Sequence, residues 1–360
     1  MIRQDSKLPL ELAEQAGRLN DGLAGSSVGV VLTRLAETGY LGLGVPGALG
    51  GLGGSLLDVV EAIATVSEQC LTSGFVFWCQ RALIEYLAAS DNSWLRSEIL
   101  PQVLQAELSG ATGLSNAMKH LAGIEHLRLH ARLDQETITL NGVLPWASNL
   151  RPKQFVIAVA AQTDSGRSIV AAVPANVAGL QRGEDLQLFG LQASWTSSLQ
   201  LNHVQLSHAW IISDNAMSFL PKIRPAFLLM QCGLSLGMAR RSLQETLQSI
   251  DGNNEVALLV RLRYNAVTLA NLESQIWYLS SLSSFTLAQT RQLFELRIGL
   301  TRLAVDLVQL ELEAKGGSAY LKPSGTARRL REVAFLPVLT PSLVLLETEL
   351  QGHPLAEKAV

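Results

Sequence analysis

The chain has 360 residues, of which 48% are hydrophobic and only 16% charged, and its formal net charge is −3. This composition excludes an intrinsically disordered chain and indicates large buried helices or a large subunit interface. No basic stripe stands out in the sequence, so we expect no nucleic acid partner. The length suffices for two or three domains of the usual ~100–200 residues.

The longest apolar run, 226–239, lies between Arg224 and Arg240 and is shorter than the ~20 residues that a membrane span needs. The first five residues lack the apolar core of a secretory signal. We therefore expect no membrane span and a cytoplasmic protein. Three cysteines have apolar neighbours and no metal-ligand spacing, which indicates reduced thiols in the core and no metal site: Cys70, Cys79 and Cys232.

From residue 8 to about residue 107, apolar side chains recur at helical spacing, for example between 57 and 68. The exception is the segment 39–55, which is rich in glycine and contains one proline. Glycine permits positive φ and close approach of backbones, so we expect this segment to shape a cleft between helices.

Near Gly110 the period changes, and residues 127–133 alternate between apolar and polar as in a half-buried strand. We predict a tight turn at the pair Asn141-Gly142. Residues 155–161 and 169–173 are apolar runs separated by turn residues, which predicts a hairpin. We expect the β-section to end at about Ile212.

Helical spacing returns at Met217. Six leucines then recur every three or four residues, the pattern of a helix packed against neighbours: Leu293, Leu296, Leu300, Leu303, Leu307 and Leu310. We expect a helical bundle that also buries a subunit interface.

Four groups of short strings, spread over about residues 25–350, carry a resemblance to a known family. They are Leu41-Gly42-Leu43-Gly44-Val45-Pro46 with Leu49-Gly50-Gly51-Leu52-Gly53; Leu140-Asn141-Gly142 with Trp146-Ala147-Ser148-Asn149; Leu236-Gly237-Met238-Ala239; and Gly316-Gly317-Ser318-Ala319-Tyr320 with Arg329-Leu330-Arg331-Glu332. In this order and at this spacing, they resemble the acyl-CoA dehydrogenases. The resemblance implies an α+β fold with a helical domain at 1–109, a β-barrel-like domain at 110–212 and a C-terminal helical bundle at 213–360.

In that family a flavin ring lies between the β-domain and the C-terminal helices and takes a hydride from the substrate. The resemblance implies that Leu114 and Ser115 meet the pyrimidine side of the ring. It implies further that Trp146 packs against the ring, with Ala147 and Ser148 beside it, and that the Gly316-Gly317 pair belongs to the cofactor site. FAD is the cofactor that the resemblance implies.

At two places the sequence departs from the family's pattern, and FMN therefore remains an alternative to FAD as the cofactor. The family's Ala-Gly-Ser-Asp string is replaced by residues 117–123, where Lys119 and His120 are candidates for meeting a phosphate or an anionic substrate, the alternative being a solvated loop. At the adenine end, Arg261 and Arg263 are the nearest counterparts of the family's diphosphate-binding arginine. Glu313 stands where the family has a glutamine, and its carboxylate would repel a diphosphate.

The family's catalytic base is missing from its usual positions. Counting from Arg331, the position of the glutamate falls on Thr340, whose hydroxyl cannot abstract a proton near neutral pH. The alternative position, within 226–229, also has no carboxylate. We expect a displaced base and leave it unassigned. Five carboxylates are candidates: Glu61, Glu68, Glu85, Glu347 and Glu349.

A second branch of the same fold contains two-component flavin monooxygenases, which use a histidine in a His-Asp-Pro string. Pro341 matches that proline, but the histidine position is Leu339. His120 is the only histidine that we expect near the flavin.

Three functions therefore stay open. The first is oxidation of the CH–CH group of an acyl thioester. Its expected substrate is a CoA thioester, and its expected electron acceptor is an electron-transfer flavoprotein. The second is a monooxygenase supplied by a flavin reductase, and the third is a flavin-binding or scaffold subunit without catalysis. In each case we expect a homodimer or homotetramer.

Overall fold

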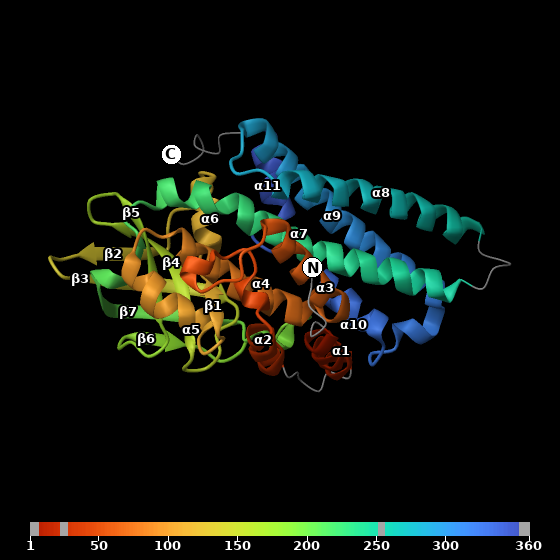
Figure 1. Cartoon of the computed structure of the whole chain (residues 1–360), viewed down its shortest axis with the longest axis horizontal. Helices are drawn as coiled ribbons and strands as arrows, with labels where there is room; N and C mark the ends of the chain where they lie inside the picture. Colours follow the sequence, from red (N-terminus) through yellow and green to blue (C-terminus); the bar gives the residue numbers. More distant parts are fainter. Residues whose placement is uncertain (1–6, 22–27, 251–255, 353–360) are drawn as a thin grey trace.

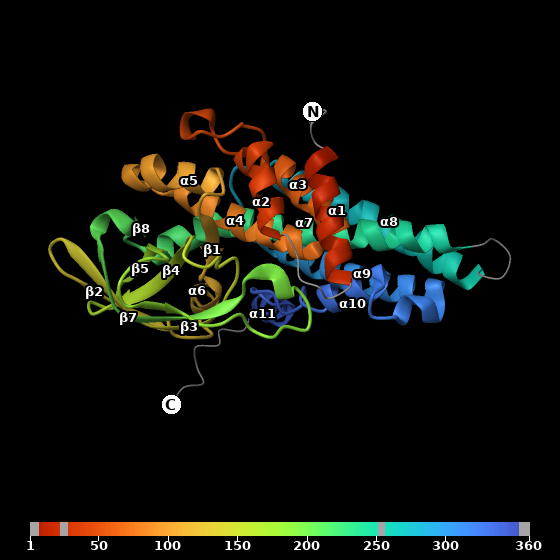
Figure 2. The ribbon, with the colours of Figure 1, turned by 90° about the horizontal axis from the view of Figure 1, so that it is seen from below.

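The computed structural model describes residues 7–21, 28–250 and 256–352. It is an elongated α+β structure, with one β-sheet at one end and long helices extending away from it (Figures 1 and 2). Among the helices in these ranges, none is long and apolar enough to cross a membrane. The N-terminal residues considered for a secretory signal, and His353, lie outside the described residues.

The N-terminal part consists of helices, as the spacing predicts. They are α1 (Lys7–Asp21), α2 (Val28–Glu37), α3 (Leu56–Gln69), α4 (Leu71–Ala89) and α5 (Leu100–Leu104). A capping box of Ser55 and Asp58 begins α3, with each side chain bonded to the backbone of the other residue. Helix α4 is buried on nearly every side, because its sequence is apolar around the whole circumference.

The middle part is an eight-stranded sheet. Its strands are β1 (Ser109–Thr112), β2 (Leu129–Leu133), β3 (Thr137–Ala147), β4 (Phe155–Thr163), β5 (Ser168–Pro174), β6 (Leu180–Arg182), β7 (Ser197–Ser207) and β8 (Ile211–Ser213). The order is β6-β7-β3-β2-β4-β5-β8, with β1 parallel to β4. The predicted hairpin is confirmed, since β4 and β5 are antiparallel neighbours.

The prediction of a tight turn at Asn141-Gly142 is wrong. Both residues lie inside β3, where the register against β7 shifts between Leu140 and Gly142. Gly142 has φ +132°, and a Cβ on it would lie 2.4 Å from the carbonyl oxygen of Arg128. The pair therefore forms a bulge, in which glycine allows a neighbouring backbone to approach, and not the end of a strand.

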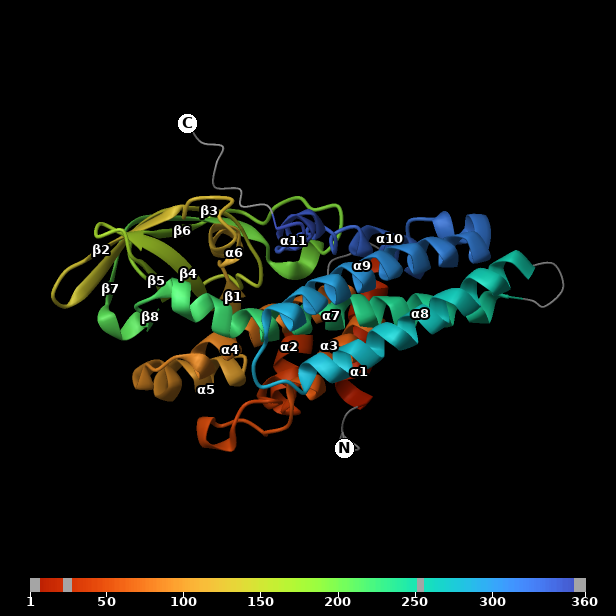
Figure 3. The same cartoon turned by 90° about the horizontal axis from the view of Figure 1, so that it is seen from above.

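The C-terminal part consists of α7 (Ala216–Ser249), α8 (Val256–Ser280), α9 (Leu287–Lys315), α10 (Gly325–Val333) and α11 (Leu343–Leu350). All six leucines of the predicted seam in α9 are buried, which confirms that prediction. Gly237 allows α7 to pack closely on α3, since a Cβ at this position would lie only 2.2 Å from the carbonyl oxygen of Ala64. Figure 3 shows α7, α8 and α9 lying side by side along the length of the molecule.

The three cysteines are buried free thiols, as the sequence predicts. Within the described residues, no group of histidine, cysteine and acidic side chains is placed to hold a metal ion.

A buried ion pair connects α10 to α9. The guanidinium of Arg329 binds the carboxylate of Glu311, with Nε 2.9 Å from Oε2, and both side chains are almost fully buried. Burial alone would raise the pKa of Glu311, but the hydrogen bond and charge of Arg329 lower it below its ordinary value. The carboxylate is therefore held ionised inside the protein by its partners.

Replacing Arg329 with Met should destabilise the protein, because Glu311 would lose its main partner while it stays buried. Lys315 remains 3.1 Å from Glu311, so we expect a loss of about 3 kcal/mol in the free energy of unfolding. Denaturant unfolding measures this loss. The control is Arg302→Met, which removes an exposed pair with Glu347 and should cost at most about 1 kcal/mol. Equal losses in the two variants would contradict the assignment.

Candidate active site

A cavity of about 560 Å³ lies where the helices meet the sheet. Several parts of the chain line it: α4, the end of β1, α6 (Ser115–Leu121) with the loop after it, the end of β3, the segment between β6 and β7, and the end of α10 with the segment that follows it. Its lining is mostly apolar, with a few hydroxyl and charged groups, as in sites that bind small molecules and cofactors. The glycine-rich segment 39–55, which we expected to shape a cleft, does not line this cavity.

One wall is formed by helix α6 (Ser115–Leu121) and the loop after it. Lys119 Nζ lies 2.7 Å from Oε1 of Glu125, and Asn116 Nδ2 lies 3.1 Å from Oε2 of the same carboxylate. The hydrogen bond from Lys119 is the largest of the influences that lower the pKa of Glu125. Glu125 is therefore an ionised anchor for this wall and a weak base.

The opposite wall is the end of β3, where Trp146 and Ser148 lie. The side chain of Trp146 is 64% exposed although it belongs to a strand. The hydroxyl of Ser148 is 2.7 Å from the hydroxyl of Thr196, which comes from the segment before β7. The register of β3 against β7 shifts between Leu144 and Ala147, so the strand end turns toward the cavity.

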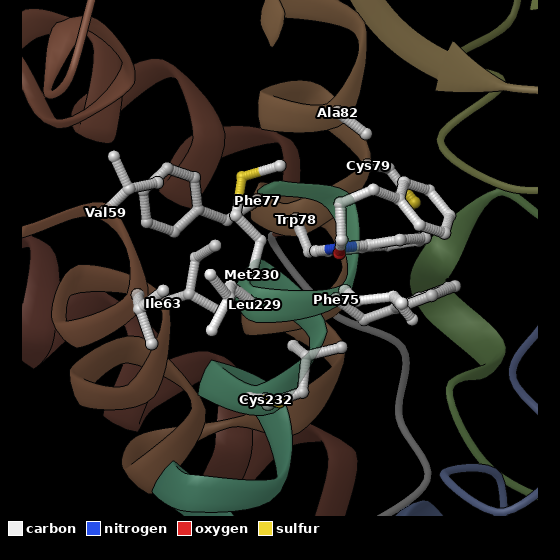
Figure 4. Close-up of a cluster of buried hydrophobic side chains, with 14 of the residues drawn as sticks. Val59, Ile63, Phe75, Phe77, Trp78, Cys79, Ala82, Leu229, Met230 and Cys232 are labelled. Atoms are coloured by element: carbon white, nitrogen blue, oxygen red, sulfur yellow. The ribbon is translucent and has the colours of Figure 1, made fainter. Parts of the chain in front are cut away.

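The inner end of the cavity is aromatic. Phe75 and Trp78, one turn apart on α4, are stacked with ring centroids 5.6 Å apart, and Figure 4 shows the two rings lying one above the other. Phe335 meets the edge of Phe75 at 5.0 Å. Cys79 also lines the cavity, and burial raises the pKa of its thiol well above the ordinary value, so it is a neutral wall residue.

The structure brings most of the predicted site residues together. Ser115, Trp146, Ala147, Ser148 and Thr340 all line the cavity, and Leu114 is buried directly before Ser115. The Gly316-Gly317 pair does not line it, because both glycines lie in a 3-10 turn at the C-terminal end of α9.

Of the two candidates for meeting an anion, only Lys119 lines the cavity. His120 lies on the other side of α6, where its Nδ1 is 3.0 Å from the carbonyl oxygen of Glu125. At the end where the resemblance places the adenine, Arg261 of α8 and Glu313 of α9 form an ion pair with each other. Arg263 is exposed on α8.

None of the five carboxylates considered as a displaced base lines the cavity. Glu61 and Glu68 lie beside Arg240, Glu85 binds Arg81, Glu347 binds Arg302 and Glu349 binds Arg224. Among the described residues that do line the cavity, Glu125 is the only carboxylate.

Sequence reasoning missed the aromatic end of the cavity. Phe75 and Trp78 belong to a mostly apolar helix. The pattern of that helix does not distinguish residues that line a cavity from residues that fill the core. The spacing of Phe75, Trp78 and Cys79 on one helical face is consistent with a shared surface, but it does not reveal that the surface borders a cavity.

The chemistry of the donor set fits a planar aromatic cofactor. Trp146 offers a large exposed ring at the wall, and covering it would remove apolar surface from water. Hydroxyls of Ser115, Ser148 and Thr196 face the same space and can bond to a heteroaromatic edge.

Comparisons with known proteins agree with this architecture. Residues 11–107 match the family model described as acyl-CoA dehydrogenase, N-terminal domain. Over 331 residues the chain is 22% identical to the probable acyl-CoA dehydrogenase YngJ of Bacillus subtilis (strain 168), an alignment that covers 85% of this chain and 84% of that protein.

Two solved structures resemble the chain over nearly its whole length. Butyryl-CoA dehydrogenase from Megasphaera elsdenii superposes with a TM-score of 0.81 at 13% identity, covering 98% of each chain. Dibenzothiophene monooxygenase TdsC from Paenibacillus sp. A11-2 superposes with a TM-score of 0.79 at 18% identity, covering 99% of this chain and 98% of that one, and TdsC has also been solved with FMN bound. The fold predicted from the sequence is confirmed.

Proposed function

We propose that this chain is a flavin-dependent oxidoreductase of the acyl-CoA dehydrogenase family, whose flavin ring binds in the cavity between α4, β3 and the segment after α10. The observation that carries the proposal is the meeting of Ser115, Trp146 and Ser148 around one cavity. Ser115 is about thirty positions away from the other two in the sequence, and the resemblance assigns all three to the flavin. The flavin would supply the redox chemistry, and the protein would supply position and a dry environment.

Each wall residue has a definite part in this proposal. Trp146 would hold the ring by stacking. The hydroxyls of Ser115 and Ser148 would donate hydrogen bonds to it, and Thr196 orients Ser148 through the 2.7 Å contact of their hydroxyls. The aromatic end at Phe75 and Trp78 would exclude water from the space beside the ring.

FMN and FAD are both candidates, and the pairing of Arg261 with Glu313 favours FMN. An adenine dinucleotide would need a cation for its diphosphate, whereas Arg261 is neutralised by the carboxylate at the position of the family's glutamine. Lys119 and Arg128, which line the cavity, are candidates for a single phosphate, because together they carry two positive charges against the one carboxylate of Glu125 that they share.

Oxygen chemistry fits the cavity better than removal of an α-proton. A carbon acid needs a base within hydrogen-bond reach, and the one carboxylate among the described lining residues is Glu125, whose pKa is lowered by Lys119. A monooxygenase that receives reduced flavin from a reductase needs no such carboxylate, although the histidine of that branch is replaced by Leu339 and no described lining residue is a histidine. We therefore place this reaction first, on a small apolar substrate.

Dehydrogenation of an acyl thioester is the second candidate. It is favoured by the similarity to YngJ, which is named a probable acyl-CoA dehydrogenase. It requires a base that moves into the cavity or is supplied by the substrate, and an acceptor such as an electron-transfer flavoprotein. Loss of catalysis would leave a flavin-binding or scaffold subunit.

The first prediction concerns flavin binding. The purified protein should bind FMN or FAD with saturation, and Trp146→Ala should weaken that binding about fivefold or more, because a stacked aromatic ring contributes on the order of 1–3 kcal/mol. Titration followed by flavin absorbance and fluorescence measures both cofactors. The matched control is Trp277→Ala, an exposed tryptophan on α8, which should leave the affinity unchanged. If neither flavin binds, the proposal fails and the scaffold reading takes its place.

The second prediction separates the two reactions. With bound flavin and no oxygen, acyl-CoAs should not bleach the flavin absorbance, whereas reduced flavin supplied with oxygen and a small aromatic or aliphatic substrate should yield an oxygenated product by mass spectrometry. Bleaching by any acyl-CoA would contradict this order and establish dehydrogenation. Hydrogen peroxide without product, for every substrate tried, would contradict the monooxygenase proposal.

An exposed apolar surface lies on α8, at the outside of the C-terminal helices (Figures 1 and 3). Val256, Val260, Tyr264 and Val267 recur every three or four residues, and each is 62–73% exposed. An apolar face of this length at helical spacing is typical of an interface. We propose that a second copy covers it in a homodimer or homotetramer, which would also bring the exposed Gly316-Gly317 turn to a neighbour.

The double variant Val260→Glu/Tyr264→Glu should convert the assembly to monomers, because two carboxylates would be buried in an apolar interface. Light scattering during size-exclusion chromatography measures the molar mass. The control, Val344→Glu, changes an equally exposed valine on α11 and should leave the assembly intact. A monomeric wild type, or an assembly that survives the double substitution, would contradict this interface.

A further inference from the structure

Arg297, in the middle of α9, is a fully buried arginine without a carboxylate partner among the described residues. Burial lowers the pKa of its guanidinium to about 10, which still leaves it protonated at neutral pH. An unpaired cation in the interior is costly, because neither water nor an opposite charge compensates it. By contrast, Arg328 and Arg329, which are also buried, each bind a glutamate.

The donors of Arg297 go to three neutral oxygens. Nη2 donates to the carbonyl oxygen of Leu336 at 3.1 Å, and Nε donates to Oε1 of Gln231 at 3.2 Å. Nη1 donates to the hydroxyl of Thr301, one turn further along the same helix. Two of the three bonds therefore leave α9, one toward the segment after α10 and one toward α7.

Gln231 continues the connection to the cavity. It is fully buried in α7, and its Nε2 donates to the carbonyl oxygen of Thr340 at 2.9 Å. Arg297 thus holds the segment 336–340 at both ends, directly at Leu336 and through Gln231 at Thr340. Val338, Leu339 and Thr340 of this segment line the cavity.

We propose that Arg297 and Gln231 are positioning residues that fix the segment 336–340 as the cavity wall facing the flavin-binding strand. The segment lies in a turn between α10 and α11, where the backbone N–H groups of Leu336, Val338 and Leu339 bond to the preceding turn. The carbonyl oxygens of Leu336 and Thr340 are instead bonded by the side chains of Arg297 and Gln231, which therefore fix where these two carbonyls lie. The guanidinium suits this task because its donors point in fixed, divergent directions. The inference concerns the same cavity as the proposed function, but its first test needs no flavin.

The experiment compares Gln231→Leu, Arg297→Lys and Arg297→Met with the wild type by hydrogen–deuterium exchange and mass spectrometry. Peptides that cover 335–343 should exchange about five- to tenfold faster in Gln231→Leu and Arg297→Met, the order expected for losing a buried hydrogen bond. Arg297→Lys keeps the charge and one donor, so it should lie between them and the wild type. Peptides of the β4–β5 hairpin should exchange as in the wild type.

The matched control is Arg81→Met, which removes another fully buried arginine, on α4, bonded to Glu85 and to the carbonyl oxygen of Leu41. It should leave exchange at 335–343 unchanged relative to the hairpin peptides. Equal acceleration of all peptides in the Gln231 and Arg297 variants, or none at 335–343, would overturn the proposal. Should Arg297→Met not fold, Gln231→Leu and Arg297→Lys decide alone.

Flavin affinity is the second readout. If the wild type binds flavin, Gln231→Leu should raise the dissociation constant several-fold while Arg81→Met leaves it near the wild-type value. If the wild type binds none, the proposed function fails, and the exchange experiment still tests the positioning role. An unchanged dissociation constant with faster exchange at 335–343 would show that the wall is held by this pair but does not touch the cofactor, which would overturn its role in the site.

Discussion

The burial of α4 is the constraint on which the arrangement of the molecule depends. A nineteen-residue helix that is apolar around its circumference must be covered on every side, and α2, α3, α7 and β1 all pack against it. Because the sheet is one of its covers, the cavity forms where this cover is incomplete, beside Phe75, Trp78 and Cys79. The site therefore arises because α4 packs against both the other helices and the sheet.

A single buried amide fixes the sheet on that helix. Gln80 of α4 accepts hydrogen bonds from the backbone of Gly110 at 2.6 Å and from Asn149 Nδ2 at 3.0 Å, and it donates to the carbonyl oxygens of Val103 and Leu108. Every polar atom of its side chain is thereby satisfied, as burial demands. Asn149 follows Ser148 and has φ +61°, a conformation that asparagine tolerates. This network links α4 to the strand end that carries Trp146 and Ser148.

The order of helical and β parts could be predicted from the local period of the sequence. The five cavity residues around Ser115, Trp146 and Thr340 came from the resemblance to the family, because their short strings match its strings in order and spacing. The sequence pattern misassigned Asn141-Gly142, since this pair is typical of a tight turn, whereas here Gly142 adopts φ +132° within a strand that stays paired, and only the pairing partner distinguishes the two. It also could not identify Arg297 or Gln231. Their role depends on carbonyl groups more than thirty residues away, and no local pattern records which backbone a buried side chain reaches.

The charges around the cavity bear on its chemistry more than any one missing residue does. Lys119, Arg128 and Arg331 line it, and Glu125 is bound by Lys119 and Asn116. Arg297 adds a further positive charge behind the wall, where the low dielectric extends its reach. Such a site lowers the energy of a negatively charged occupant, and its one carboxylate among the described lining residues, Glu125, is only a weak base for a proton. Negative charge on the occupant would therefore be stabilised. A proton released during the reaction would have to pass to water or to another atom of the occupant.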